Sequence, residues 1–280
     1  MKLRNCKYTS SSGGCSSLNL PEVNQLDCLW NCGFYSNQSQ VFLSLLILLG
    51  HGIEPEKISY AMGFKRMKKE EDRDIYPDFY KTNFDEKIKL FKRVTLPDEN
   101  KKQFGLYEFD YYNQIINKFF NPSDLVLERK NYLLEKYNIN PQETICVLYR
   151  GTDKYTEVRL AHPTSYLNVV RELLQVTQSK KVLVQTDQTQ VLTYFKEELG
   201  DLVVSFDEIP TTSGQEPMNT VMEKAGADTM DFQQWFDAAL RCLADCSYVV
   251  NHTGNCALWL NLYRGNVKNV FQFDEFGNLS

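Results

Sequence analysis

The hydrophobic pattern of the second half of the chain, from about residue 141, alternates short apolar runs with longer segments of helical spacing. The apolar runs predict five strands, at Ile145–Tyr149, Lys181–Gln185, Leu202–Phe206, Tyr248–Asn251 and Val267–Phe271. The segments between them predict helices, at Pro163–Val176, Thr189–Leu199, Asp231–Asp245 and Asn255–Tyr263. Strands that alternate with helices indicate an α/β fold with a parallel sheet, and their continuous apolar character indicates that helices cover both of its faces.

The first half of the chain has a less regular pattern. It predicts an exposed charged loop over residues 65–82 and three helices, at Ser36–Leu49, Tyr107–Phe120 and Ser123–Tyr137. Ser123 is a suitable N-cap for the third helix. The polar stretch Asn138–Pro141 is typical of a boundary between domains. We therefore expect two α/β lobes, residues 1–140 and 141–280, with a cleft between them.

Composition and charge are those of a globular protein of one large or two ordinary domains. The chain has 280 residues, of which 42% are hydrophobic and 24% charged. The net charge of −5 gives no electrostatic reason to expect nucleic acid as a partner. The basic run at 65–69 is followed at once by three acidic residues, which indicates a solvated face. The longest apolar run, Val41–Leu49, is shorter than the roughly 20 residues that span a bilayer, so we expect a buried helix and no membrane segment.

The eight cysteines do not form a strong metal-binding motif. The pairs Cys28-x3-Cys32 and Cys242-x3-Cys246 lack the two- or four-residue spacing and the histidine partners of a zinc site. Free, partly buried thiols are therefore expected, with a structural metal or a redox role as the alternative.

Polar side chains gather where the predicted strands end. Arg150–Lys154 follows the first strand, Thr186-Asp187 the second and Asn251–Asn255 the fourth. Cys32–Asn37 precedes a helix of the other lobe. The carboxyl ends of parallel strands lie at one edge of the sheet, where such folds bind ligands. An arginine fork and the first amides of a helix both bind phosphate, so the pattern points to a nucleoside diphosphate.

Each of these features also has a structural explanation. An Arg-Gly-Thr-Asp turn, a Thr-Asp helix entry and an aspartate such as Asp237 on a helix all occur without any catalytic role. The chain has neither a Walker-type phosphate loop nor a Gly-x-Gly-x-x-Gly sequence, so ATPase and nicotinamide-dependent functions lack their motifs.

Three short motifs follow the first predicted strand, namely Tyr149–Lys154 (Tyr-Arg-Gly-Thr-Asp-Lys), Thr156-Glu157 and His162-Pro163. Their order and spacing resemble the donor-binding motif of GDP-fucose-dependent fucosyltransferases. The resemblance is greatest to the α1,6-fucosyltransferases, which include rhizobial nodulation-factor enzymes and animal N-glycan core enzymes. Further segments are similar to parts of the same family, at Asn31–Asn37, Val184–Asp187 and Phe236-Asp237 with the strand that follows. The likeness covers residues 141–265 well and residues 28–50 faintly.

The resemblance implies a GT-B fold, with two Rossmann-like lobes, and an inverting, metal-independent glycosyltransferase without a cofactor. Such an enzyme moves fucose from GDP-fucose to a hydroxyl of a glycan acceptor. Arg150 is then expected to neutralise the β-phosphate of the leaving GDP, and Glu157 to act as the general base. Lys154 and Asp153 would assist Glu157, as a relay or by orienting it.

The resemblance also implies contacts to the donor, at Ser36, Asn37, Asp187, Asp237, Thr253 and Gly254. The carboxylate of Asp237 would lie near the guanine. Thr253 or Gly254 would lie near the phosphates, and Ser36 and Asn37 would reach the phosphates from the N-terminal, acceptor-side lobe.

Four positions depart from the family pattern. Gly151 replaces a second arginine, Leu148 a histidine near the base, and Gln188 the second acid of Thr-Asp-Asp, while residues 252–255 replace a Ser-Ser-Gln turn. Three alternatives remain open: a different fucosyltransferase, a transferase using another GDP- or UDP-sugar, and a non-catalytic relative that binds a nucleotide or glycan.

The cellular location follows from two observations. Residues 1–17 are polar and serine-rich, without the apolar segment of a secretory signal. Asn251-His252-Thr253 is an N-glycosylation sequon inside the expected donor site, where a glycan would block the ligand. We therefore expect a cytoplasmic enzyme, with a lumenal enzyme trimmed of its anchor as the alternative.

Overall fold

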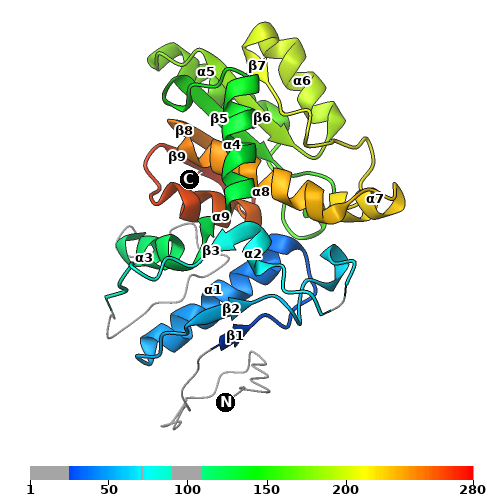
Figure 1. Ribbon diagram of the computed structural model, residues 1–280. Coiled ribbons are helices and arrows are strands. Elements are labelled where there is room, and N and C mark those ends of the chain that lie inside the picture. The colour runs from blue at the N-terminus through cyan, green and yellow to red at the C-terminus, as the bar shows by residue number, and fades with distance from the viewer. Residues whose placement is uncertain (1–24, 71, 90–108, 280) are drawn as a thin grey trace. The chain divides into compact units, whose positions relative to one another are not determined.

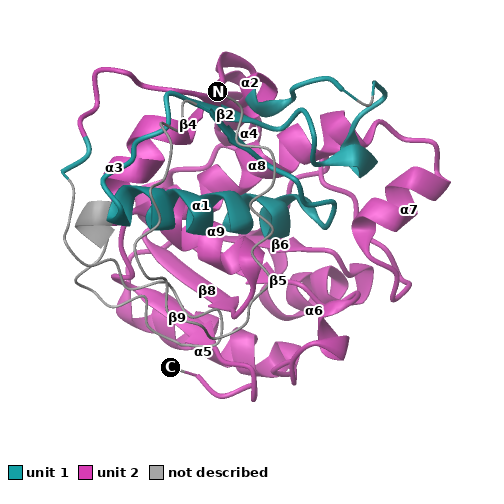
Figure 2. Ribbon diagram, turned by 90° about the horizontal axis from the view of Figure 1, so that it is seen from below, with its two compact units in different colours: residues 1–76, 88–96 teal, residues 77–87, 97–280 magenta. Residues whose placement is uncertain are grey.

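The structure, a computed structural model, describes residues 25–70, 72–89 and 109–279. Contacts between Cα atoms divide the chain into two compact units (Figure 2). Unit 1 comprises Met1–Tyr76 and Ile88–Leu96, and unit 2 comprises Pro77–Lys87 and Pro97–Ser280. Unit 2 contains the predicted parallel sheet, and each unit is described separately below.

Unit 2 is built on a five-stranded parallel sheet with the strand order β7-β6-β5-β8-β9 (Figure 1). Its strands are β5 (Thr144–Tyr149), β6 (Lys181–Thr186), β7 (Val203–Val204), β8 (Tyr248–His252) and β9 (Val270–Phe273). From β5 the chain adds β6 and β7 on one side, and then returns to add β8 and β9 on the other. The winding therefore reverses between β5 and β8, and ligands of open α/β sheets bind outside the carboxyl ends of the strands at such a switch point.

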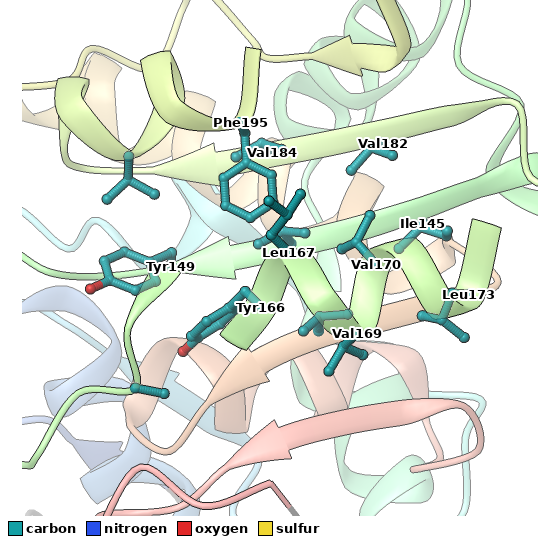
Figure 3. Close-up of a cluster of buried hydrophobic side chains, with 14 of the residues drawn as sticks. Ile145, Tyr149, Tyr166, Leu167, Val169, Val170, Leu173, Val182, Val184 and Phe195 are labelled. Carbon is teal, nitrogen blue, oxygen red and sulfur yellow. The ribbon is translucent and has the colours of Figure 1, made fainter. Parts of the chain in front are cut away.

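One face of the sheet is covered by α5 (Pro163–Val176) and α6 (Thr189–Leu199). Alternate residues of the strands, such as Val147 and Val184, form an apolar cluster with Leu167 and Val170 of α5 and Phe195 of α6. Figure 3 shows these helix side chains against the strands. Both helices have the bounds that the hydrophobic spacing predicts.

The other face of the sheet is covered by α8 (Thr229–Asp245), and the thiol of Cys146 donates to the carbonyl oxygen of Leu243 there, at 3.3 Å. Helix α9 (Asn255–Arg264) connects β8 to β9 and packs against α8. The described chain also contains α7 (Met218–Lys224), a short helix that the hydrophobic pattern does not predict.

Helices α3 (Phe109–Phe119) and α4 (Asp124–Lys136) pack against α9 and α8 and belong to unit 2. The hydroxyl of Ser123 accepts the amide of Val126 at 3.3 Å and caps α4, as the sequence predicts. The compact units thus differ from the expected division at residue 140, because both helices precede that residue yet pack against helices of the C-terminal half.

The exposed loop predicted over residues 65–82 is wrong for its second part. Residues 75–80 include α2 (Tyr76–Phe79) and the start of β3 (Tyr80–Lys81), which pairs with β4 (Asn121–Pro122). The side chains of Ile75 and Phe79 are fully buried. Because charged residues precede this buried aromatic segment, the sequence pattern wrongly assigned it to the exposed loop.

Unit 1 contains α1 (Phe34–Gly50) and the parallel strands β1 (Gln25–Asp27) and β2 (Lys57–Ser59), with a short 3₁₀ turn, η1 (Lys65–Met67). Its core combines aliphatic residues of α1 with several aromatic ones, and the rings of Tyr60 and Phe64 stack at 4.2 Å between centroids. The apolar run 41–49 lies within α1 and is largely buried, as predicted. In the parts of the chain described, no helix is both long enough and apolar enough to cross a membrane.

Candidate functional site

Arg150 is the first residue after β5, beside the switch point of the sheet. Its Nη2 donates to Oδ1 of Asp153 at 3.0 Å, and its Nη1 donates to Sγ of Cys256 at 3.3 Å. Its Nε lies 3.5 Å from Oδ2 of Asp187. The side chain is still 30% exposed. A guanidinium has five N–H donors, so these three contacts leave two donors for a ligand.

The turn after Arg150 is held by Asp187, at the end of the neighbouring strand β6. The backbone amide of Gly151 donates to Oδ1 of Asp187, and the hydroxyl of Thr152 donates to Oδ2, both at 2.8 Å. The sequence therefore correctly places Asp187 at this edge. Both carboxylate oxygens face the turn, and a direct contact to the donor stays a prediction.

Gly151 has a steric explanation in this structure. A Cβ atom at this position would lie 2.3 Å from Oε1 of Gln188 and 2.7 Å from a ring carbon of Tyr149. Any side chain here would have to displace Gln188 or the tyrosine ring. The second arginine of the fucosyltransferase motif would therefore fit here only if the side chains of Gln188 and Tyr149 moved.

His252, at the end of β8, holds the same turn from the opposite side. Its Nε2 accepts the backbone amide of Arg150 at 3.1 Å, and its Nδ1 lies 2.7 Å from the carbonyl oxygen of Thr253. The sequence analysis did not select His252 as a functional residue. The available signal was its place directly after an apolar strand that neighbours the Arg150 strand.

Lys154 and Glu157 form an ion pair close to the turn that joins β8 to α9. Gly254 in that turn has φ +142°, and a Cβ added to it would lie 3.0 Å from Cε of Lys154. The lysine side chain is thus packed against the backbone of Gly254 and is 12% exposed, while Glu157 is 56% exposed. Five predicted site residues, Arg150, Asp153, Lys154, Asp187 and Gly254, are therefore brought together, with Glu157 at their open side.

The start of α9 completes this group. Gly254 is its N-cap and supplies no side chain to cap the helix. The first amides of a helix have no acceptor within the helix, and they attract anions. Cys256, in the first turn, contacts Arg150, so these amides lie close to the guanidinium. Thr253 is half-buried, and its amide donates to the carbonyl oxygen of Phe273 at 2.9 Å.

The local charges fix the protonation of two groups. The Cys256 sulfur and the carboxylates of Asp187 and Asp153 raise the pKa of Arg150 above its ordinary value, although burial opposes them, and the guanidinium stays cationic. Burial, together with the neighbouring cations Arg150 and Lys154, lowers the pKa of His252 to about 4. The imidazole is therefore neutral at pH 7.

Asp237 lies on α8, in a separate and largely buried hydrogen-bond network. Its Oδ2 accepts Nε of Arg241 at 3.0 Å, and its Oδ1 accepts the hydroxyl of Tyr263 at 2.7 Å. The Tyr263 hydroxyl also lies 3.0 Å from that of Tyr80. The carboxylate has no exposed surface. A contact with guanine stays a prediction, and it would require this network to open.

Replacing Asp237 with asparagine distinguishes the two roles. Breaking a buried ion pair from one side costs about 3–5 kcal/mol, so we expect Asp237→Asn to lower the free energy of unfolding by about that amount. Because the carboxylate is enclosed, we expect the ratio of affinities for GDP and IDP, which lacks the guanine amino group, to stay the same. Calorimetric titration of both nucleotides measures this ratio, and a loss of preference for GDP would instead support the guanine contact.

Ser36 and Asn37 lie in the first turn of α1, which belongs to unit 1, whereas the site residues described above belong to unit 2. The side chain of Asn37 is fully buried, and its Oδ1 accepts the amide of Cys32 at 2.8 Å. It thereby fixes the turn that enters the helix. Ser36 is half-buried. Their contact with phosphates stays a prediction.

The cysteines and the sequon have clear structural settings. Cys28, Cys242 and Cys246 are buried and unpaired with one another, and Cys32 is exposed. Among the described residues, no three side chains of the metal-binding types are placed to hold a metal ion. Asn251 is completely buried, so the folded chain does not offer its amide for glycosylation.

The comparisons with known proteins identify the class of fold. No family model and no curated protein matches the sequence. Among solved structures, the chain is similar to NodZ α-1,6-fucosyltransferase co-crystallised with GDP, with a TM-score of 0.54 and 13% identity over 93% of this chain and 98% of that one. A structure of fucosyltransferase NodZ from Bradyrhizobium gives a TM-score of 0.53 with the same identity and the same coverage of both chains.

The fold is therefore α/β of the GT-B type, as predicted, and it is the fold of the NodZ fucosyltransferases. A third NodZ structure, soaked with GDP-fucose, aligns with a TM-score of 0.42 and 13% identity over 88% of this chain. In that alignment the chain spans 64% of the other chain, which is less than two thirds of its length.

Proposed function

We propose that this chain is an inverting glycosyltransferase that transfers fucose from GDP-fucose to a hydroxyl group of a glycan. The observation that carries this proposal is the placement of Arg150. Its partly exposed guanidinium lies at the switch point of a fold that NodZ shares, beside the start of α9, whose N-cap residue Gly254 has no side chain. NodZ has been crystallised with GDP, which supports a guanine nucleotide as the ligand here.

Arg150 would stabilise the leaving group. When the bond between fucose C1 and the β-phosphate oxygen breaks, negative charge develops on the GDP diphosphate. The two N–H donors of Arg150 that the protein does not use would bind this charge, and the first amides of α9 would add to them. Stabilisation of developing charge by fixed donors is worth on the order of 3–4 kcal/mol per donor group.

Glu157 would take the proton of the acceptor. The acceptor oxygen attacks C1 of fucose as the C1–phosphate bond breaks, GDP leaves with the bonding electrons, and the hydroxyl proton passes to the Glu157 carboxylate. The 56% exposure of Glu157 makes it accessible to a glycan, and its ion pair with Lys154 holds it close to the turn between β8 and α9, where the phosphates would bind. A positioned base contributes about 10²–10⁴-fold to such a rate.

Glu157→Gln tests this role. The amide cannot accept a proton, so we expect turnover of GDP-fucose to fall by about 10²–10⁴-fold while GDP binding changes little. Product formation with a fucose acceptor and GDP titration by calorimetry measure the two effects. Glu172→Gln, at an exposed position of α5, is the matched control and should keep the wild-type rate. Equal losses of turnover in both variants would remove Glu157 from the mechanism.

A second candidate is a transferase with another nucleotide sugar. It is favoured by Gly151, which replaces the second arginine of the fucosyltransferase motif in a turn where the side chains of Gln188 and Tyr149 pack closely. A panel of sugar nucleotides in a hydrolysis assay separates the candidates, because turnover of a UDP-hexose without turnover of GDP-fucose would establish the second. Binding of GDP without turnover of any donor would indicate a non-catalytic relative.

The proposed mechanism uses no metal, so chelation by EDTA should leave the rate unchanged.

A further inference from the structure

The hydrogen bonding of β5 differs on its two sides near Arg150. Toward β6, the strand pairing continues to the end of β5, with Tyr149 opposite Thr186. Toward β8, the pairing ends two residues earlier, with Val147 opposite Val250. The backbone amide of Arg150 therefore has no strand partner on the β8 side. The imidazole of His252 takes that place and accepts the amide at 3.1 Å.

The contacts of His252 define its tautomer. Nε2 accepts a backbone N–H, so this nitrogen carries no proton. Nδ1 lies 2.7 Å from the carbonyl oxygen of Thr253, which is only an acceptor, so Nδ1 carries the proton. Both ring nitrogens are thus occupied, and the side chain is 5% exposed. A second proton, on Nε2, would face the N–H of Arg150.

The surroundings of His252 favour the neutral form. Burial is the main cause of the lowered pKa of the ring, because a charged imidazole loses its hydration. The cations Arg150 and Lys154 add to this effect, whereas Asp187 opposes it. The ring is therefore a permanent hydrogen-bond acceptor for Arg150 under physiological conditions.

We propose that His252 is a positioning residue for the Arg150 guanidinium, acting through the backbone amide of Arg150, an inference that rests on the proposed function. Asp187 fixes the turn from β6, through Gly151 and Thr152, and His252 fixes it from β8. The turn is held from both sides of β5, so the guanidinium meets the diphosphate without a loss of backbone freedom on binding. His252 belongs to the segment that departs from the Ser-Ser-Gln turn of the related family.

Two substitutions of His252 separate the acceptor from the rest of the ring. In His252→Asn, the side-chain amide reaches the position of Nδ1 and loses the acceptor at Nε2. In His252→Gln, the longer side chain reaches the position of Nε2 and offers an oxygen to Arg150. We expect GDP affinity, measured by calorimetry, to fall on the order of tenfold in His252→Asn. We expect His252→Gln to recover most of this loss.

A purely structural role would give a different pattern. Loss of packing would lower the melting temperature of both variants and would reduce their GDP affinity together. Equal GDP affinities of the two variants therefore overturn the proposal, whatever their melting temperatures. His51→Asn is the control for loss of a histidine, because His51 is exposed, lies at the C-terminal cap of α1 and belongs to none of the motifs above.

A second measurement keeps this inference separate from the proposed function. Nitrogen NMR of the unliganded protein should show His252 as the neutral ring protonated on Nδ1, and hydrogen exchange should show a protected Arg150 amide. His252→Asn should lose that protection. If the wild-type protein does not bind GDP, the proposed function fails, while a protected Arg150 amide still supports its hydrogen bond to His252. A ring protonated on Nε2, or an unprotected Arg150 amide in the wild type, overturns it.

Discussion

Arg150→Ala is expected to weaken GDP binding by at least about 100-fold. A hydrogen bond to a charged group contributes about 1.5–3 kcal/mol, and the two remaining N–H donors of the guanidinium would each bind a phosphate oxygen. The loss of both corresponds to about 3 kcal/mol or more. Arg150→Lys keeps a cation without the planar fork, so its affinity should lie between those of the wild type and the alanine variant. Thermal shift with millimolar GDP and calorimetric titration measure these effects.

Asp153→Asn is the companion variant with the opposite expected sign. Oδ1 of Asp153 accepts Nη2 of Arg150 and, as an anion, competes with the diphosphate for the same guanidinium. Its neutralisation should therefore tighten GDP binding a few-fold. If Arg150→Ala keeps the wild-type stabilisation by GDP, the phosphate site lies elsewhere and the assignment of Arg150 is wrong.

Asp187→Ala is expected to lower the free energy of unfolding by about 3 kcal/mol. The carboxylate is 7% exposed, and its removal leaves the amide of Gly151 and the hydroxyl of Thr152 without their acceptor. Each unsatisfied buried donor costs about 1–3 kcal/mol. Arg150 also loses a counter-charge. Urea denaturation at pH 7 measures the change, and Asp187→Asn should lose less, because its Oδ1 can still accept the Gly151 amide.

Asp201→Ala is the control for the loss of an aspartate. Asp201 is exposed in the short turn before β7, and a surface substitution of this kind changes stability by less than about 0.5 kcal/mol. An equal effect of the Asp187 and Asp201 substitutions would show that the turn is stable without its carboxylate acceptor.

The elements of unit 2 could be predicted where local signals agree with the hydrophobic period. Helix α5 has the predicted bounds, because Pro163 occupies its first turn and His162 caps it. The strand β7 is shorter than predicted, since Gly200–Leu202 forms a 3₁₀ turn that takes up Leu202. The last strand begins three residues later than predicted, at Val270. Strand ends depend on pairing partners, which a single sequence does not contain.

The site could be located from the sequence, but the role of each side chain could not. Arg150 and Asp187 are expected at one edge because both follow apolar strands. That the Asp187 carboxylate accepts the amide of Gly151 depends on the register between β5 and β6, which aligns Tyr149 with Thr186. The contact of His252 depends on where the pairing of β5 with β8 ends. Neither is encoded in local spacing.

Asp237 shows a signal that was available in the sequence. Arg241 follows it by four residues on the predicted helix, a spacing that places opposite charges side by side. The third member of the network, Tyr263, lies on α9 and comes close only when α8 and α9 pack together. The ion pair was thus predictable from the helix period, and the complete burial of its carboxylate was not.

The central claim is that the guanidinium of Arg150 binds the diphosphate of a nucleotide donor. A crystal of the protein soaked with GDP tests it most directly. We predict a β-phosphate oxygen within about 3.2 Å of the Arg150 guanidinium, with the first amides of α9 turned toward the same phosphate. GDP bound away from the carboxyl ends of β5 and β8, with Arg150 paired only to Asp153 and Asp187, would contradict the claim.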